Sequence, residues 1–184
     1  GIKKLHFVGI GGVGMSAIAE VMLDKGYEIS GSDLSESAVV KHLKAKGATI
    51  YKGHDALNVE GKEALVLSSA IHQDNPELVA AKAKGLKLFH RSDILAYLLN
   101  DAKGIAVAGA HGKTTTSSMI SVVLEHAKVD PTILIGGFVD YLKGNAKLGK
   151  SDYLVAEADE SDGSFLKFYP KIAVVTNIED DHMD

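Results

Sequence analysis

The chain contains no cysteine, and this absence excludes two kinds of architecture. Without thiols it can form neither a disulfide scaffold nor a thiolate metal site, and its composition suits a reducing cytoplasm. No apolar run approaches the roughly eighteen residues of a membrane span. The N-terminal Gly1-Ile2-Lys3-Lys4 leads into a predicted strand and not into a signal peptide. We therefore expect a cytoplasmic protein with no membrane partner.

An excess of positive charge is also missing. The formal net charge is -4, from 20 Lys and Arg against 24 Asp and Glu, and the two signs are interspersed along the chain. This balance argues against a general nucleic-acid surface, so no nucleic-acid partner is expected. With 184 residues and 46% apolar content, the chain can form one large domain or two small ones with real cores. We predict two.

Strand-like runs alternate with segments of helical periodicity in the first half of the chain. This alternation predicts a Rossmann-like α/β domain with a parallel sheet, and ligands bind such sheets at the carboxyl ends of the strands. The apolar positions of residues 94–99 predict a closing helix. The predicted strands are residues 5–8, 28–31, 49–51, 64–68 and 87–89, and the predicted helices are residues 13–25, 36–46 and 76–84.

A polar linker that ends in glycine, residues 100–104, separates this region from a second α/β unit. We predict two domains, 1–101 and 102–184. In the second, residues 114–126 carry Met119, Ile120, Val123 and Leu124 at helical spacing. Its predicted strands are residues 104–108, 132–135, 153–157 and 172–176.

The first predicted strand runs into a G-x-G-x-x-G motif with glycines at positions 9, 11 and 14. The next strand is followed by Asp33, close to the spacing at which a carboxylate accepts hydrogen bonds from a ribose. Three readings remain open. The loop binds a dinucleotide and belongs to a nicotinamide-dependent oxidoreductase, it binds the diphosphate of a UDP-sugar, or it is a tight turn without a ligand.

A second glycine-bearing loop, residues 109–116, lies between a predicted strand and a predicted helix and contains Gly112-Lys113-Thr114. Such a loop holds a nucleoside triphosphate through backbone N–H groups, a lysine that reaches the phosphates and a hydroxyl that ligates Mg²⁺. The first glycine of the usual G-x-x-x-x-G-K-[ST] pattern would fall at Val107, and Gly109 stands closer. We predict a triphosphate site here, which also includes Thr115.

Acidic residues follow two later strands. Glu157 ends an apolar strand and begins a cluster of four carboxylates in six residues, at the position where a phosphate-loop protein needs a Mg²⁺ ligand or a water-orienting group. A polar stretch, residues 177–182, follows the last strand. Of eight histidines, only His111 and His182 are candidates for a role, and the others are interpreted as packing or surface residues. Because Mg²⁺ prefers oxygen ligands, spacing alone does not assign His182 to a metal.

Taken together, these segments resemble the ATP-dependent Mur ligases of peptidoglycan precursor synthesis. The resemblance covers the whole chain and departs at Ala110, where the family often has Thr; this is tolerable because a phosphate loop works mainly through backbone N–H groups. Five ordered segments carry it: Gly9 to Ser16, Ser68-Ser69-Ala70-Ile71 with Asn75-Pro76-Glu77, Gly109 to Thr116, Glu157 to Asp162 with Ser164-Phe165, and Thr176 to Glu179 with Asp181 to Asp184.

The resemblance implies an enzyme of three domains, of which this chain would contain the first and part of the second. The implied reaction joins L-alanine to the lactyl carboxylate of UDP-N-acetylmuramate through an acyl phosphate, with ATP and Mg²⁺ as cofactors. The chain starts on Gly1 and ends at Asp184 without a helix stop signal. We expect a fragment that does not turn over by itself.

By resemblance, Lys113 contacts the β- and γ-phosphates, and the hydroxyl of Thr114 holds a first Mg²⁺. Glu157 and His182 match metal-binding positions near the γ-phosphate and the acyl phosphate. The ATP loop comprises Gly109, Ala110, His111, Gly112, Lys113, Thr114 and Thr115. The residues expected to contact the UDP-sugar are Gly9, Gly11, Gly12, Gly14, Asp33, Ser69 and Arg91.

Other functions remain open. The nearest is a recycling ligase that joins a whole tripeptide to the same UDP-sugar, although Ser161 fits the alanine-adding members better by resemblance. A nicotinamide-dependent oxidoreductase would leave the triphosphate loop unexplained. A non-catalytic nucleotide-binding module is a third alternative.

Overall fold

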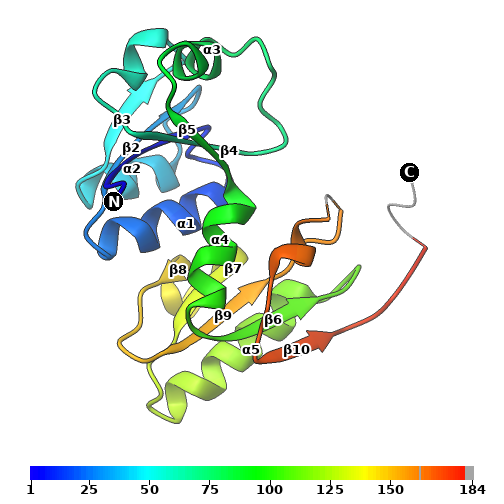
Figure 1. Cartoon of the computed structure of the whole chain (residues 1–184). Helices are drawn as coiled ribbons and strands as arrows, with labels where there is room; N and C mark the ends of the chain where they lie inside the picture. The colour runs from blue at the N-terminus through cyan, green and yellow to red at the C-terminus, as the bar shows by residue number, and fades with distance from the viewer. Residues whose placement is uncertain (162, 181–184) are drawn as a thin grey trace. The chain divides into compact units, whose positions relative to one another are not determined.

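The computed structural model describes residues 1–161 and 163–180 and shows two successive α/β units (Figure 1). The first unit extends from Gly1 to Arg91, and the second begins at Ser92. The division falls at the start of helix α4 (Arg91–Asn100), whereas the predicted linker lies at the other end of this helix. No helix in the described ranges has the length and apolarity that a membrane crossing requires.

The first unit contains a five-stranded, fully parallel sheet in the order β3-β2-β1-β4-β5. The order reverses beside β1, so the chain winds outward from the centre in both directions, as in Rossmann-like folds. The predicted parallel α/β fold is therefore confirmed. The strands are β1 (Lys4–Val8), β2 (Glu28–Asp33), β3 (Thr49–Lys52), β4 (Ala64–Leu67) and β5 (Lys87–His90).

Three helices and a 3₁₀ turn connect these strands: α1 (Val13–Asp24), α2 (Ala38–Ala45), η1 (Ala56–Val59) and α3 (Pro76–Ala83). Helices α1 and α2 contact each other on one side of the sheet, and α3 contacts η1 on the other side (Figure 1). This placement follows from right-handed crossovers that run in opposite directions from the centre of the sheet. Local signals set the helix starts, since the Ser37 and Asn75 side chains accept hydrogen bonds from first-turn N–H groups.

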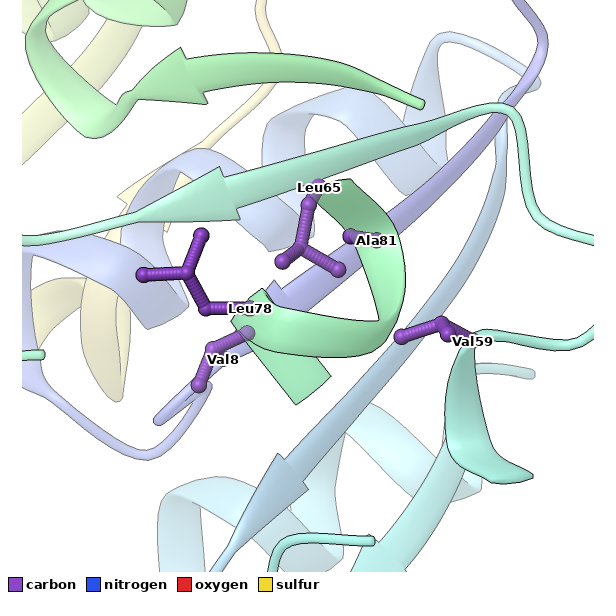
Figure 2. Close-up of a cluster of buried hydrophobic side chains, with 5 residues drawn as sticks. All are labelled: Val8, Val59, Leu65, Leu78 and Ala81. Carbon is purple, nitrogen blue, oxygen red and sulfur yellow. The ribbon is translucent and has the colours of Figure 1, made fainter. Parts of the chain in front are cut away.

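The core on the α3 side consists of five buried aliphatic side chains from β1, η1, β4 and α3 (Figure 2). Strands β1 and β4 contribute from the sheet, and α3 places two residues one turn apart over them. Strands buried on both faces carry nearly continuous apolar runs, which explains why the sequence pattern located them. The cluster comprises Val8, Val59, Leu65, Leu78 and Ala81.

The second unit has a sheet in the order β10-β6-β9-β7-β8, in which only the β7–β8 pair is antiparallel. Strand β8 (Gly144–Lys147) was not predicted, because Gly-Asn-Ala-Lys carries no apolar alternation. Its partner β7 extends four residues beyond the predicted end at Ile135. The remaining strands are β6 (Lys103–Ala108), β7 (Thr132–Val139), β9 (Tyr153–Glu157) and β10 (Ile172–Val175), and short 3₁₀ turns lie at η2 (Asp140–Leu142) and η3 (Ser164–Lys167).

Helix α5 (Lys113–His126) packs on this sheet through small polar residues. Ser117 and Ser121 are fully buried, and their hydroxyls donate to backbone carbonyls four residues earlier in the same helix. Met119 and Val123, which contributed to the helical prediction, are 65% and 66% exposed. The helix was predicted correctly, but its apolar spacing does not mark its buried face, because serines that satisfy their own hydroxyls allow close contact with the sheet.

Candidate functional sites

The glycine loop of the first unit connects β1 to α1 and is defined here as residues 9–14. Gly9 has a φ of +74°, and the loop closes through a hydrogen bond from the Gly12 N–H to the Gly9 carbonyl of 3.1 Å. Gly12 is the N-cap of α1 and has no side chain to cover the first turn. The loop therefore places backbone N–H groups at a helix N-terminus, an arrangement suited to a phosphate or diphosphate.

Asp33 ends β2 beside this loop and contacts it directly. Its Oδ2 accepts the Gly11 N–H at 2.8 Å, and its Oδ1 accepts the Ser35 N–H at 3.1 Å. A Cβ added to Gly11 would lie 2.7 Å from Asp33 Oδ2 and 3.0 Å from a Val40 methyl, so the close approach requires glycine. Asp33 was predicted as a ribose contact; the structure adds that its carboxylate holds the loop.

The other predicted UDP-sugar contacts follow neighbouring strands of the same parallel sheet. Ser69 comes two residues after β4, and its hydroxyl lies 3.0 Å from His90 Nε2. Arg91 follows β5, and a Cβ at Gly14 would lie 3.5 Å from Arg91 Nη1. Because parallel strands end at one sheet edge, the loop, the Asp33 carboxylate, the Ser69 hydroxyl and the Arg91 guanidinium all belong to the edge where ligands bind.

The phosphate loop of the second unit is defined here as residues 109–114, which follow β6 and include the first two residues of α5. Gly109 has a φ of +136°, and a Cβ there would overlap Thr176 Oγ1, so only glycine fits. Gly112 is the N-cap of α5, with a φ of +85°, and Thr115 lies exposed in the first turn. A fourteen-residue helix thus directs its N-terminus at the loop, which favours bound anions.

The ammonium group of Lys113 contacts both the loop backbone and an acidic side chain. Its Nζ donates to the Gly109 carbonyl at 2.6 Å and forms an ion pair with Glu160, whose two oxygens lie at 3.2 and 3.3 Å. Both side chains are partly buried, with 22% and 28% of their surface exposed. A triphosphate bound at this loop would compete with the Glu160 carboxylate for the Lys113 ammonium group.

Residues after β10 hold the phosphate loop from the side. The His111 carbonyl accepts hydrogen bonds from Thr176 Oγ1 at 2.6 Å and from Asn177 Nδ2 at 2.9 Å, and the His111 N–H donates to Asn177 Oδ1 at 3.0 Å. The His111 ring lies 3.2 Å from a Glu179 carboxylate oxygen. The sequence motif placed Thr176 and Asn177 near the site but did not indicate that they fix the loop backbone.

Glu157 and Thr114, the described candidates for Mg²⁺ ligation, both lie beside the Gly136-Gly137 segment of β7. Glu157 Oε2 accepts the Gly136 N–H at 2.7 Å, and its Oε1 lies 3.3 Å from the Ser117 hydroxyl. A carboxylate and a hydroxyl suit Mg²⁺, which binds few protein oxygens and keeps several waters or phosphate oxygens.

The third predicted metal ligand, His182, lies outside the described residues. Within residues 1–161 and 163–180, no group of three or more His, Cys, Asp or Glu side chains is arranged to hold a metal. The described donors are therefore sufficient only for an ion whose remaining ligands come from a nucleotide and from water.

A pocket of about 560 Å³ adjoins the phosphate loop on the sheet face opposite α5. Glu157 contacts α5 and lies in register with Val107, so the alternate residues Ala106 and Ala108 point to the other face. The pocket is polar only near the loop and apolar along β10. Its lining includes Ala106, Ala108, Ala110, Glu160, Phe165, Phe168, Val175 and Asn177.

Comparison with known families extends these observations over nearly the whole chain. A model of the Mur ligase family catalytic domain matches residues 4–115, and a model of the Mur ligase middle domain matches residues 107–184. The two matched ranges overlap over residues 107–115, which include the phosphate loop. The first covers the glycine loop as well, so both loops described above lie within the family's own pattern.

Two curated relatives, the UDP-N-acetylmuramate–L-alanine ligases of Dictyoglomus turgidum and Hydrogenobaculum sp., are 56% and 58% identical to the chain. The alignments cover 99% and 98% of the chain but only 39% and 40% of these relatives. The chain thus spans about two fifths of their length.

Two solved structures share the fold. UDP-N-acetylmuramate–alanine ligase from Thermotoga maritima matches 97% of the chain and 42% of its own, with a TM-score of 0.92 and 35% identity. UDP-N-acetylmuramate:L-alanyl-γ-D-glutamyl-meso-diaminopimelate ligase from Neisseria meningitides matches 100% of the chain and 63% of its own, with a TM-score of 0.91 and 31% identity. Since the first family model spans more than half of the residues, and the motifs and fold agree with it, the chain belongs to the Mur ligase family.

Proposed function

We propose that this chain provides the UDP-sugar-binding domain and part of the ATP-binding domain of a ligase that joins L-alanine to UDP-N-acetylmuramate in peptidoglycan precursor synthesis. The observation that carries the proposal is a pair of glycine-bearing loops at helix N-termini in separate α/β units, of which only the second contains a lysine. Residues 1–101 and 102–184 are the proposed domains. Relatives that carry this ligase name share more than half of the chain's residues.

The proposed chemistry follows from what each loop can bind. A carboxylate becomes an acyl donor only when one of its oxygens is made a leaving group, and phosphorylation by ATP achieves this. The acyl phosphate is then attacked by the amine of L-alanine, and phosphate leaves. Phosphoryl transfer depends mainly on positioning and charge neutralisation. These are the properties that a backbone N–H cradle and a lysine provide.

In this proposal Lys113 neutralises charge on the β- and γ-phosphates, while N–H groups of residues 109–115, apart from that of His111, position them. The Thr114 hydroxyl and the Glu157 carboxylate would hold Mg²⁺, with His182 as a further ligand. The ion would supply charge neutralisation at the transferred phosphoryl group. The link between Asn177 and the His111 backbone would keep the loop in its binding shape before ATP arrives.

The UDP-sugar is proposed to bind at the edge of the first sheet. Gly9, Gly11, Gly12 and Gly14 would shape the loop over the diphosphate, which would lie at the N-terminus of α1, and the Arg91 guanidinium would add positive charge. Asp33 and Ser69 would contact the ribose or sugar. The pairing of Asp33 with the loop supports this arrangement, since a ligand touching the loop would also reach this carboxylate.

A ligase that adds a whole tripeptide to the same UDP-sugar is the second candidate. The Neisseria structure carries such a name and matches the fold as well as the alanine ligase from Thermotoga. Identity favours alanine, because the curated alanine ligases are 56% and 58% identical to the chain and the Neisseria protein is 31% identical. Ser161, whose hydroxyl bonds to Asp159, agrees with the alanine assignment by family resemblance.

The first experiment compares ligands for the glycine loop. Isothermal titration calorimetry of the chain with UDP-N-acetylmuramate and with NADH should give tighter binding of the UDP-sugar. The reverse order would support the oxidoreductase alternative and contradict the ligase proposal.

The second experiment tests the amino acid. In a full-length protein that contains this segment, release of phosphate from ATP should require both UDP-N-acetylmuramate and free L-alanine. Equal or faster release with the tripeptide in place of L-alanine would move the assignment to the tripeptide-adding enzyme. Binding of both nucleotides without phosphate release under any of these conditions would favour a non-catalytic module.

A further inference from the structure

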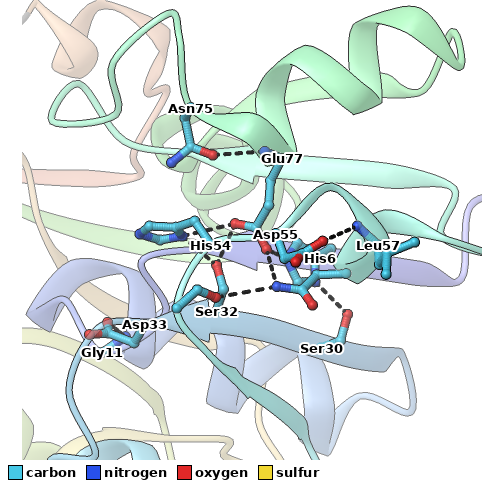
Figure 3. A network of polar contacts seen from close by, with 12 residues as sticks. His6, Gly11, Ser30, Ser32, Asp33, His54, Asp55, Leu57, Asn75 and Glu77 are labelled. Atoms are coloured by element: carbon cyan, nitrogen blue, oxygen red, sulfur yellow. Dashed lines mark hydrogen bonds and ion pairs between the residues drawn. The ribbon is translucent and has the colours of Figure 1, made fainter.

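A buried polar network lies beneath the glycine loop and is centred on Glu77, at the start of α3 (Figure 3). The Glu77 side chain is completely buried and comes from the Asn75-Pro76-Glu77 motif, to which no role has been assigned above. One of its oxygens lies 2.9 Å from both His6 Nε2 and Asn58 Nδ2. An ionised carboxylate is costly to bury unless several donors surround it. The surrounding hydrogen-bond partners therefore hold the Glu77 carboxylate in one position.

The second carboxylate oxygen of Glu77 faces the carboxyl end of β2. It accepts the Ser32 hydroxyl at 2.5 Å and lies 3.0 Å from His54 Nδ1, which is itself 2.9 Å from the Ser32 hydroxyl. Burial raises the pKa of Glu77, but hydrogen bonds from His6, Ser32 and Asn58 more than offset this and lower it. An ionised carboxylate accepts hydrogen bonds only, which matches this set of surrounding groups.

Ser32 joins this network to the glycine loop. Its side chain points to Glu77, while its backbone carbonyl accepts the N–H groups of Gly9 at 2.8 Å and Ile10 at 3.0 Å. The next residue, Asp33, accepts the Gly11 N–H. Three successive N–H groups of the loop are thus fixed by two successive residues of β2. The only side-chain hydrogen bonds of Ser32 within the described residues go to Glu77 and His54.

From this geometry we infer that Glu77 is a positioning residue for UDP-sugar binding: through Ser32 it holds the glycine loop in the shape that receives the diphosphate. The inference rests on the proposed function, because it assigns the loop to the UDP-sugar. It goes further in naming a residue that touches no ligand. Preorganising a loop improves affinity because less ordering remains to be done when the ligand binds.

Ser32→Ala is the most specific test, because it removes the hydroxyl that joins Glu77 to the loop strand and keeps the backbone carbonyl. Ser30→Ala is the matched control. Ser30 is equally buried, lies two residues earlier on β2, and contacts the same network through His6 Nδ1 at 2.8 Å. Both variants lose one hydroxyl, but only Ser32 supports the loop.

Calorimetry should show that Ser32→Ala and Glu77→Gln weaken UDP-N-acetylmuramate binding about tenfold, whereas Ser30→Ala changes it less than about twofold. ATP binding, assigned to the other unit, should stay unchanged in all three. If Ser32→Ala and Ser30→Ala lower the melting temperature alike and neither weakens UDP-sugar binding, the network only stabilises the fold and the inference is wrong.

A second measurement separates this inference from the proposed function. In the ligand-free chain, amide hydrogen exchange at Gly9 and Ile10, followed by NMR and corrected for global stability, should accelerate about tenfold in Ser32→Ala and Glu77→Gln but not in Ser30→Ala. Unchanged exchange would refute the positioning role. If exchange accelerates but the wild-type chain binds no UDP-sugar, the proposed ligand is wrong and the structural link remains.

Discussion

The glycine loop and the phosphate loop have the same local arrangement but differ in their supporting contacts and in their charge. Each follows an interior parallel strand, contains glycine and precedes a helix. The glycine loop itself contains no cationic residue. The cationic residue predicted to contact the UDP-sugar, Arg91, follows strand β5. The phosphate loop carries Lys113 within itself, already paired with Glu160. The glycine loop thus offers a ligand only its backbone. The phosphate loop also offers the Lys113 ammonium group, which a ligand would have to draw away from Glu160.

The supports of the loops differ as well. The glycine loop is tied to the next strand, with Gly11 and Asp33 separated by 22 residues. The phosphate loop is tied to Thr176 and Asn177, which lie 65 and 66 residues further along the chain than His111. Each loop is thus held by residues of, or just after, a strand that pairs with its own, but that strand is the next one in the sequence for the glycine loop and a much later one for the phosphate loop. Substitutions in each loop can test whether these differences matter.

The largest effect is expected from Lys113→Ala. Loss of the only lysine in the phosphate loop should weaken ATP binding about 100-fold, because charge-assisted contacts to phosphate are among the strongest. UDP-sugar binding should remain within about twofold of wild type, since it is assigned to the first unit. Calorimetry with each nucleotide measures both effects.

Lys171→Ala, which removes an exposed lysine from the same unit, is the control for net charge. A large loss of UDP-sugar binding in Lys113→Ala would contradict the assignment of the two nucleotides to separate loops.

The next effect concerns the glycines. Gly109→Ala places a Cβ against Thr176 at a backbone angle that favours glycine, and ATP binding should weaken about 30-fold. Gly11→Ala, which crowds Asp33, should instead weaken UDP-sugar binding. Gly144→Ala is the control, because a Cβ there meets only one atom, at 4.0 Å. If either loop variant impaired both ligands equally, the two sites would not be independent.

Acid should reduce the contribution of Glu77 to stability. Its pKa is lowered in the fold from an ordinary value of 4.5, so ionised Glu77 stabilises the first unit above pH 4.5 and this contribution is lost as the pH falls below that value. The stability difference between wild type and Glu77→Gln should therefore narrow below pH 4.5 in chemical denaturation. A constant difference across this range would show that Glu77 does not act through its charge.

Asp130 in the second unit provides a comparison for this titration. The pKa of Asp130 is also lowered, chiefly by its hydrogen bond from Lys147, but its side chain is 36% exposed, whereas that of Glu77 is fully buried. Asp130→Asn should produce a weaker pH dependence than Glu77→Gln, because solvent screens a partly exposed pair.

The smallest effect should come from Glu160→Gln. Removing the anion that pairs with Lys113 in the free protein should strengthen ATP binding about threefold, since partly exposed ion pairs contribute modestly. Asp159→Asn removes a neighbouring carboxylate that forms a turn with Ser161, and it should change ATP affinity less. Weaker ATP binding in Glu160→Gln would instead indicate that this carboxylate takes part in holding the nucleotide.

Sequence patterns predicted the strand–helix alternation well because buried parallel strands are continuously apolar and several helices begin at side-chain caps. They failed at β8, whose residues gain their strand conformation only from pairing with β7. They also indicated the wrong buried face for α5, because serine hydroxyls that donate to carbonyls of the same helix can be buried against the sheet. Tertiary context determines both features.

For the sites, glycines and the lysine were predictable because few other residues serve at these loop positions. The partners of the loops were not, since hydrogen bonds from Ser32, Thr176 or Asn177 depend on which strands become neighbours. Glu77 appeared only as part of a family motif, and His6 and His54 were interpreted as packing or surface residues. Their joint role depends on contacts between residues 23 to 71 positions apart.

The long sequence separation between His111 and the residues that hold it, Thr176 and Asn177, affects the order in which the sites can form during translation. Strand β6 lies between β9 and β10, both of which come later in the chain, so the ribosome releases the phosphate loop well before its supports. Contacts of long sequence separation form slowly because a large loop must first close. The glycine loop can be complete while the phosphate loop of the nascent second unit still lacks its supports, so the proposed ATP site would be among the last parts of this segment to form.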